Sequence, residues 1–200
     1  VLPPEAVEPT LDAEAFAFGQ QTHQVIDAFF NLGVFYGEAP AVTPSEIAPG
    51  VTLLASGGGN SIAVSYEHGL IVAEAPVSPK HGSTLVDTLA ERFAGVPITH
   101  VVQSHFHQDH AAGVRSLAAA GATVVVSDDA TEFWDSVLSA ESTIRPDALA
   151  SAGVVPEVEA VPLDGTFVIQ DANVTITVHH VSANPHADDM LVTVIETGGA

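Results

Sequence analysis

The 200-residue chain contains no cysteine. This absence excludes disulfide bonds and thiolate metal sites, so histidine and carboxylate groups are the strong metal ligands that remain. Lysine and arginine are also scarce: together they number 4 against 25 aspartate and glutamate residues, and the formal net charge is −21. Such a surface repels phosphate backbones and anionic lipids, so we expect no nucleic-acid and no membrane partner. Two interpretations of the acidity stay open, a high-salt habitat and a solubilising surface.

The chain also lacks a long hydrophobic run. Its apolar stretches, such as residues 69–73, are interrupted within a few positions and stay far below the roughly 18 to 20 residues that a membrane helix needs. With 46% hydrophobic residues the chain can bury a core of its own. We therefore expect a soluble protein. The sequence begins Val-Leu-Pro-Pro and shows no signal pattern, so cytoplasmic and secreted or periplasmic locations stay open.

Composition divides the chain near residue 50. Residues 1–50 are rich in proline and acidic groups and are predicted to be an N-terminal extension with one helix within residues 13–30. Residues 51–200 are predicted to form the main domain, with α/β layering. Strands are expected at 51–56, 61–66, 70–75, 98–102, 122–127, 167–169, 174–181 and 190–195, and helices at 81–94, 111–120 and 130–138. Residues 141–156 are expected to be irregular and to serve as a lid.

Four metal-binding groups gather directly after the strand expected at residues 98–102, in the stretch His105-Phe106-His107-Gln108-Asp109-His110. On extended backbone, imidazoles at i and i+2 point the same way, and a carboxylate and a third imidazole just beyond can address a neighbouring position. A helix N-cap role would explain Asp109 but not three histidines. The spacing favours two metal ions over one.

This stretch, followed by Ala111-Ala112-Gly113, resembles the HxHxDH motif of the metallo-β-lactamase superfamily. Residues 69–76 are similar to the family's strand ahead of the metal loop, and residues 184–191 are similar to its third-histidine loop. The resemblance spans about residues 51 to 197. It implies a metallo-β-lactamase-like αββα sandwich, of which this chain holds the first half and part of the second.

The resemblance also implies the site. His105, His107 and His186 would form a three-histidine zinc site with a fourth position for water, while Asp109 and His110 would begin a second site, so that each chain holds one or two zinc ions. By sequence alone His186 is isolated, 79 positions after His107, on a proline-containing loop. The implied function is zinc-dependent hydrolysis of a small molecule. Water activated by zinc would attack an ester, lactone, thioester or amide-type carbonyl, and Asp109 would orient the water and accept its proton.

Two positions depart from the family pattern. Glu74 stands where the family usually has an aspartate that supports the metal loop, and we expect its longer carboxylate to hold that loop by hydrogen bonds. Gln108 stands where the diiron oxidoreductase branch usually has glutamate, which disfavours a redox role.

The second metal site lacks ligands, because the family's bridging aspartate and last histidine normally lie beyond the third-histidine loop, whereas this sequence ends at Ala200. We expect either that the sequence is a fragment or that a partner or a second copy covers the apolar face of its first sheet. Candidate replacement ligands are Asp188, Asp189, and one of His179 and His180, which alternate across a strand. The alternative function is a non-catalytic domain that binds one structural zinc or needs a partner or its missing C-terminal segment.

Overall fold

The computed structural model describes residues 41–57, 59–142 and 146–198. The chain divides into two compact units, residues 1–38 and 39–200, and the described residues all lie in the second. The helix expected within residues 13–30 lies outside the described residues. Strand β1 (Thr43–Ala48) pairs with the next strand, so the main domain begins before the expected boundary at residue 51. The sequence did not show β1, because a largely exposed edge strand has no apolar alternation.

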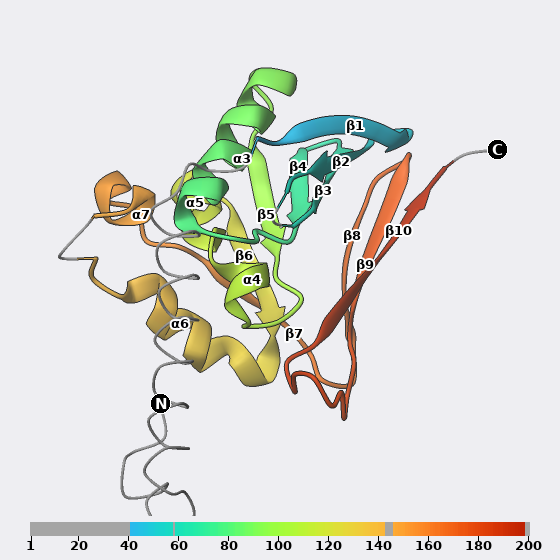
Figure 1. The fold of residues 1–200 in the computed structure, drawn as a ribbon. Helices are drawn as coiled ribbons and strands as arrows, with labels where there is room; N and C mark the ends of the chain where they lie inside the picture. The colour runs from blue at the N-terminus through green and yellow to red at the C-terminus, as the bar shows by residue number, and fades with distance from the viewer. Residues whose placement is uncertain (1–40, 58, 143–145, 199–200) are drawn as a thin grey trace, which may run out of the picture. The chain divides into compact units, whose positions relative to one another are not determined.

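A seven-stranded sheet, ordered β1-β2-β3-β4-β5-β6-β7, forms the centre of the domain (Figure 1). Strands β1 to β4 are antiparallel neighbours, whereas β4 to β7 run parallel. The strands expected between residues 51 and 127 are confirmed within two residues at each end, and β7 was not anticipated. After β1 they are β2 (Val51–Ala55), β3 (Ser61–Tyr66), β4 (Gly69–Ala73), β5 (Ile98–Val102), β6 (Thr123–Ser127) and β7 (Val158–Val161).

Helices cover one face of this sheet (Figure 1). Their apolar sides and the sheet bury a cluster that includes Leu54, Leu85, Val101, Leu117 and Trp134. The helices are α3 (Pro79–Arg92), α4 (Gln108–Ala111), α5 (Val114–Ala119), α6 (Thr131–Ser139) and α7 (Ala148–Ala152), and a 3-10 helix spans Asp128–Ala130.

Two helix predictions need correction. The single helix expected at residues 111–120 is broken at Gly113 into α4 and α5, because Gly113 lies against Gly82 of α3 and bonds to the Ala75 carbonyl. The segment 141–156, expected to be irregular, contains α7, a helix of 5 residues that is too short to show a helical period. Asp147 caps α7 by accepting a hydrogen bond from the Ala150 amide.

A second, three-stranded sheet packs on the opposite face through a valine-rich cluster that includes Val64, Val125 and Val178. Its order is β10-β9-β8, and the strands are β8 (Thr166–Gln170), β9 (Val174–His180) and β10 (Leu191–Thr197). Within the described residues, Val168, Val192 and Val194 on its outward side are exposed. Association through this face stays a prediction. No helix in the described part of the chain is long and apolar enough to span a membrane.

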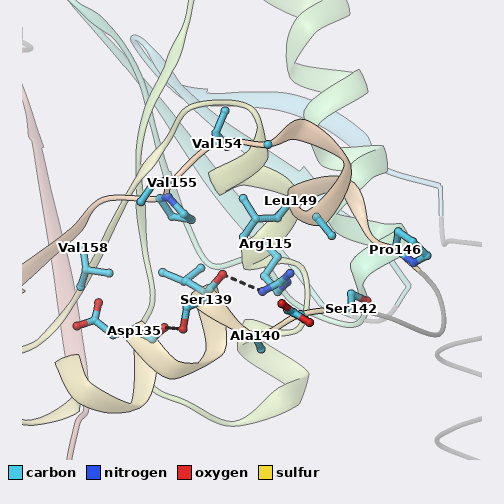
Figure 2. A pocket seen from close by; sticks show the side chains of 15 residues that line it. Arg115, Asp135, Ser139, Ala140, Ser142, Pro146, Leu149, Val154, Val155 and Val158 are labelled. Carbon is cyan, nitrogen blue, oxygen red and sulfur yellow. Dashed lines mark hydrogen bonds between the residues drawn. The ribbon is translucent and has the colours of Figure 1, made fainter.

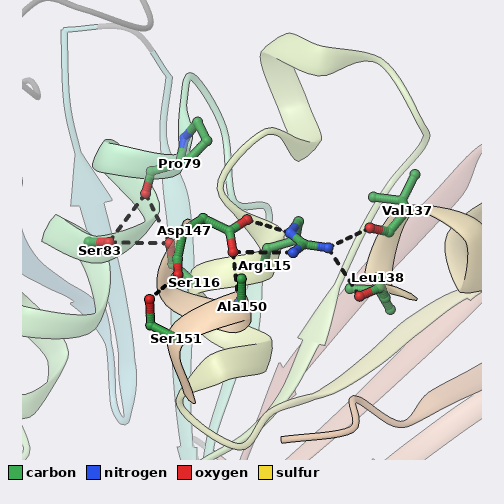
Figure 3. A network of polar contacts seen from close by, with 9 residues as sticks. All are labelled: Pro79, Ser83, Arg115, Ser116, Val137, Leu138, Asp147, Ala150 and Ser151. Carbon is green, nitrogen blue, oxygen red and sulfur yellow. Dashed lines mark hydrogen bonds and ion pairs between the residues drawn. The ribbon is translucent and has the colours of Figure 1, made fainter. Parts of the chain in front are cut away.

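Arg115 joins three helices of the helical layer (Figure 3). Its guanidinium forms a two-point ion pair with the carboxylate of Asp147 at the start of α7, and its Nη1 donates to the Val137 and Leu138 carbonyls near the end of α6. Both side chains are largely buried, 14% and 17% exposed. Burial alone would raise the pKa of Asp147, but hydrogen bonds from Arg115 and Ala150 hold it below its usual value.

Arg115→Met is expected to lower the free energy of unfolding by about 2 to 4 kcal/mol near neutral pH, because it leaves a shielded carboxylate unpaired. The pKa of Asp147 is lower in the folded protein than in the unfolded chain. The stability lost in Arg115→Met is therefore fully present at pH values above the pKa of Asp147 in the unfolded chain. It shrinks as the pH falls through the pKa of Asp147 in the folded protein. Urea unfolding at neutral and acidic pH measures both effects. Arg92→Met is the control because Arg92 makes a single cation–π contact with Phe93. Equal losses at both positions would contradict the assignment.

Candidate metal centre

Three imidazoles converge where β5 ends. His105 and His107 follow β5, and His186 comes from the loop that joins β9 to β10; their ligand atoms all lie within 4.8 Å of one another. The Nε2 atom of His186 is 3.1 Å from Nδ1 of His107 and 3.2 Å from Nε2 of His105. Of the residues that the structure describes, these three alone form a group able to hold a metal ion.

Two of the three nitrogen separations are close to those of a tetrahedral zinc site, and the third is at most 4.8 Å. With Zn–N bonds of about 2.0 to 2.1 Å, neighbouring nitrogen ligands lie about 3.3 to 3.4 Å apart, close to the two separations observed here. The Nδ1 atom of His105 is 2.8 Å from the Ser104 hydroxyl, which orients the ring and leaves Nε2 for a metal. Burial, with the charges of His110, His107 and His186, lowers the pKa of His105 to about 4, so the ring is neutral at neutral pH and keeps the lone pair that a metal needs.

Backbone hydrogen bonds fix the loops that present the three rings. The carbonyls of Asp109 and His110 accept from the amides of Val77 and Ala75, which ties α4 to the segment after β4. The Leu191 amide donates to the Ser104 carbonyl at 2.7 Å and so joins the second sheet to the His105 loop.

Backbone strain concentrates around the same loops. Among the described non-glycine residues, positive φ angles occur only at Glu74, Val77 and Ala183. The first two follow β4 and the third lies on the His186 loop. For a β-branched residue such as Val77 this conformation costs of order 1 to 3 kcal/mol and persists only where the surroundings enforce it.

Glu74 holds the metal loop by hydrogen bonds, as the sequence predicts. Its Oε1 accepts from the Ser104 amide at 2.9 Å, and its Oε2 lies 2.8 Å from Nδ1 of His110. With Nδ1 of His110 engaged, its Nε2 faces the Asp109 carboxylate at 3.8 Å. Asp109 is 74% exposed. These two residues lie beside the histidine group without joining it, and their role at a second metal stays a prediction.

The candidate replacement ligands lie outside the histidine group. His179 is exposed on the outer side of β9, while Nε2 of His180 contacts the Asp188 carbonyl at 3.0 Å. Asp189 is buried, and burial raises its pKa although the Phe106 backbone bonds to it and His107 lies near. Through this contact with the Phe106 backbone, Asp189 helps to hold the metal loop, a role that its isolated position in the sequence did not indicate.

A cavity of about 720 Å³ opens elsewhere, in the helical layer (Figure 2). Arg115, Leu149 and Val154 contribute to its lining, which contains no histidine. Among the described residues the group that could hold a metal ion lies at the three imidazoles, away from this cavity, so we place the chemistry there.

A family model described as the metallo-beta-lactamase superfamily matches residues 77–197. The chain belongs to the metallo-β-lactamase superfamily. The match covers β5, the histidine motif and the His186 loop, so the fold class predicted from the sequence is confirmed. No curated protein matches the chain.

Solved metallo-β-lactamases share this fold. A B3 metallo-β-lactamase with an active-site glutamic acid superposes with a TM-score of 0.56 at 20% identity, covering 79% of this chain and 58% of the other. The metallo-β-lactamase SMB-1 bound to 2-mercaptoethanesulfonate gives a TM-score of 0.57 at 19% identity, and the match covers 78% of this chain and 59% of SMB-1. A Cronobacter sakazakii metallo-β-lactamase with a HARLDQ motif gives a TM-score of 0.56 at 20% identity, and the match covers 82% of this chain and 61% of the other. The chain thus spans less than two thirds of these superfamily members, and the likeness shows the fold alone.

Proposed function

We propose that this protein is a zinc-dependent hydrolase that cleaves an ester, lactone, thioester or amide-type bond of a small molecule. The observation that carries the proposal is the convergence of His105, His107 and His186, with nitrogen separations of 3.1 and 3.2 Å, at an open position where strands end. The superfamily fold supports a hydrolytic metal site but does not select a substrate.

The chain's own groups suit this chemistry. A zinc ion at the three imidazoles supplies Lewis-acid activation of water and of a carbonyl oxygen. His105 is buried and neutral, whereas His186 is exposed, so substrate approaches from the His186 side. The carboxylate of Asp109, which is 74% exposed, would orient the reacting water and accept its proton.

The test combines metal content with turnover. We expect about one zinc ion per chain after dialysis, hydrolysis of p-nitrophenyl acetate by the loaded protein, loss of turnover with EDTA and recovery with added zinc. His107→Ala should lose both zinc and turnover, while His179→Ala, on the exposed side of β9, should keep both. Unchanged zinc content in His107→Ala would overturn the assignment.

Glu74→Gln is expected to weaken zinc binding about 10- to 100-fold, because the amide loses the charge that holds Nδ1 of His110 and fixes the metal loop. Competition with a chromophoric chelator measures the change. Glu67→Gln is the control, since Glu67 lies exposed on the turn between β3 and β4. Equal affinities for the two variants would show that Glu74 has no supporting role.

A second candidate function is the binding of a single zinc ion without catalysis, and the ligand set of the candidate metal site favours it. Three imidazoles form one site, and Asp109 and His110 find no third ligand among the described residues. A domain that binds a single zinc without catalysis would give one zinc per chain, a higher melting temperature with zinc and no ester turnover at any zinc concentration.

A further inference from the structure

Two phenylalanine side chains are exposed beside the imidazole cluster. Phe106, between the two histidines of the loop after β5, is 45% exposed, and Phe133, on α6, is 46% exposed. Their rings meet edge to face, with centroids 5.8 Å apart at 66°. Residues from separate segments thus form one apolar surface, which we call the aromatic wall.

The aromatic wall is continuous with the candidate metal site. The Phe106 ring lies edge-on to the His107 ring at 4.6 Å between centroids, and the His107 ring is 4.6 Å from that of His186. A molecule whose reacting carbonyl lies at the three imidazoles therefore has the two phenylalanine rings within reach of its neighbouring atoms.

Buried neighbours hold both phenylalanines of the aromatic wall in place. The Phe133 ring packs edge to face, at 5.4 Å, on Trp134, which is 2% exposed. The backbone of Phe106 bonds to the buried carboxylate of Asp189. Rigid aromatic surfaces lose little conformational entropy when a ligand covers them.

The packing of the core does not explain why Phe106 and Phe133 are exposed side by side. Helix α6 already buries Trp134 and Leu138 in the core, whereas Phe133 leaves 46% of its surface exposed. A single exposed phenylalanine is ordinary on a protein surface, but two in contact beside a reactive site mark a place where apolar groups bind.

We propose that the aromatic wall binds the apolar acyl or ring part of an uncharged ester or lactone, and that Phe106 and Phe133 determine specificity. This inference rests on the proposed hydrolase function. The net charge of −21 and the carboxylate of Asp109 beside the site disfavour anionic substrates, which leaves neutral, apolar acyl groups as the matching class.

The kinetic test compares p-nitrophenyl octanoate with p-nitrophenyl acetate, each corrected for its uncatalysed rate. Full burial of one methylene favours binding about fourfold, so partial contact of six methylenes should raise kcat/KM of the zinc-loaded wild type at least about tenfold for octanoate. Phe106→Ala and Phe133→Ala should each reduce this octanoate-to-acetate ratio at least about threefold. Val168→Ala is the matched control, since Val168 is 47% exposed on the outer sheet, and its ratio should equal that of the wild type.

A binding test separates the wall from the chemistry. With zinc-free protein, saturation-transfer NMR should show contact with 1-hexanol in the wild type and in Val168→Ala, and at most about half of that contact in the Phe106→Ala/Phe133→Ala double variant. Equal ratios and equal hexanol contact in all variants would overturn the aromatic wall, whether or not esters are hydrolysed. Hexanol contact that depends on the two rings, without ester turnover by zinc-loaded wild type, would support the wall and reject the hydrolase function.

Discussion

Gly82→Ala is expected to destabilise the protein by about 3 kcal/mol or more, although alanine is the better helix former by about 1 kcal/mol. A Cβ at this position of α3 would lie 2.4 Å from the Gly113 carbonyl oxygen and 2.7 Å from its Cα. These are backbone atoms, so no side-chain rotation relieves the overlap. The helix would have to move away from the turn between α4 and α5.

That movement should also reach the metal loop. The Gly113 amide donates to the Ala75 carbonyl at 2.8 Å, and the Ala75 amide donates to the His110 carbonyl. Separation of α3 from this turn therefore disturbs the anchor of the histidine motif. We expect Gly82→Ala to lower zinc affinity in the fraction that folds.

Urea unfolding measures the stability of Gly82→Ala, and Gly57→Ala is its control. A Cβ at Gly57 would meet nothing within 4 Å, so that variant should stay within about 0.5 kcal/mol of the wild type. If both variants unfold at the wild-type urea midpoint, close packing at Gly82 does not stabilise the fold.

His186→Ala is expected to abolish stable zinc binding. Structural zinc sites with four ligands bind with about 10 to 16 kcal/mol, so the loss of one of three protein ligands should weaken affinity by about 100- to 1,000-fold. In the wild type, free zinc at 100 times its dissociation constant should add about 2.7 kcal/mol of stability, and the variant should gain almost none.

Thermal unfolding with and without zinc provides the readout for His186→Ala. Because His186 is exposed, the zinc-free variant should melt like the zinc-free wild type, so that a lost zinc response reports the site and not the fold. His179→Ala should respond to zinc as the wild type does. A normal zinc response in His186→Ala would show that the third imidazole is not a ligand.

Local sequence pattern by itself determined much of this protein. Apolar alternation and turn residues located the strands from residue 51 to 127, because burial on one or both faces of a sheet leaves a regular trace in the sequence. The stretch from His105 to His110 was visible as a metal motif for a similar reason: neighbours in sequence are neighbours in space. Exposed β1 and short α7 left no such trace.

Only the tertiary structure decided which groups meet. His186 was isolated by its own sequence context, and family resemblance alone connected it to the motif. Its ring reaches His105 and His107 because the two sheets pack through a valine cluster and the Leu191 amide bonds to Ser104. The contacts of Gly82 with Gly113 and of Phe106 with Phe133 arise in the same way. Sequence periodicity fixes which face a side chain points to, whereas packing between layers fixes which distant side chain it finds there.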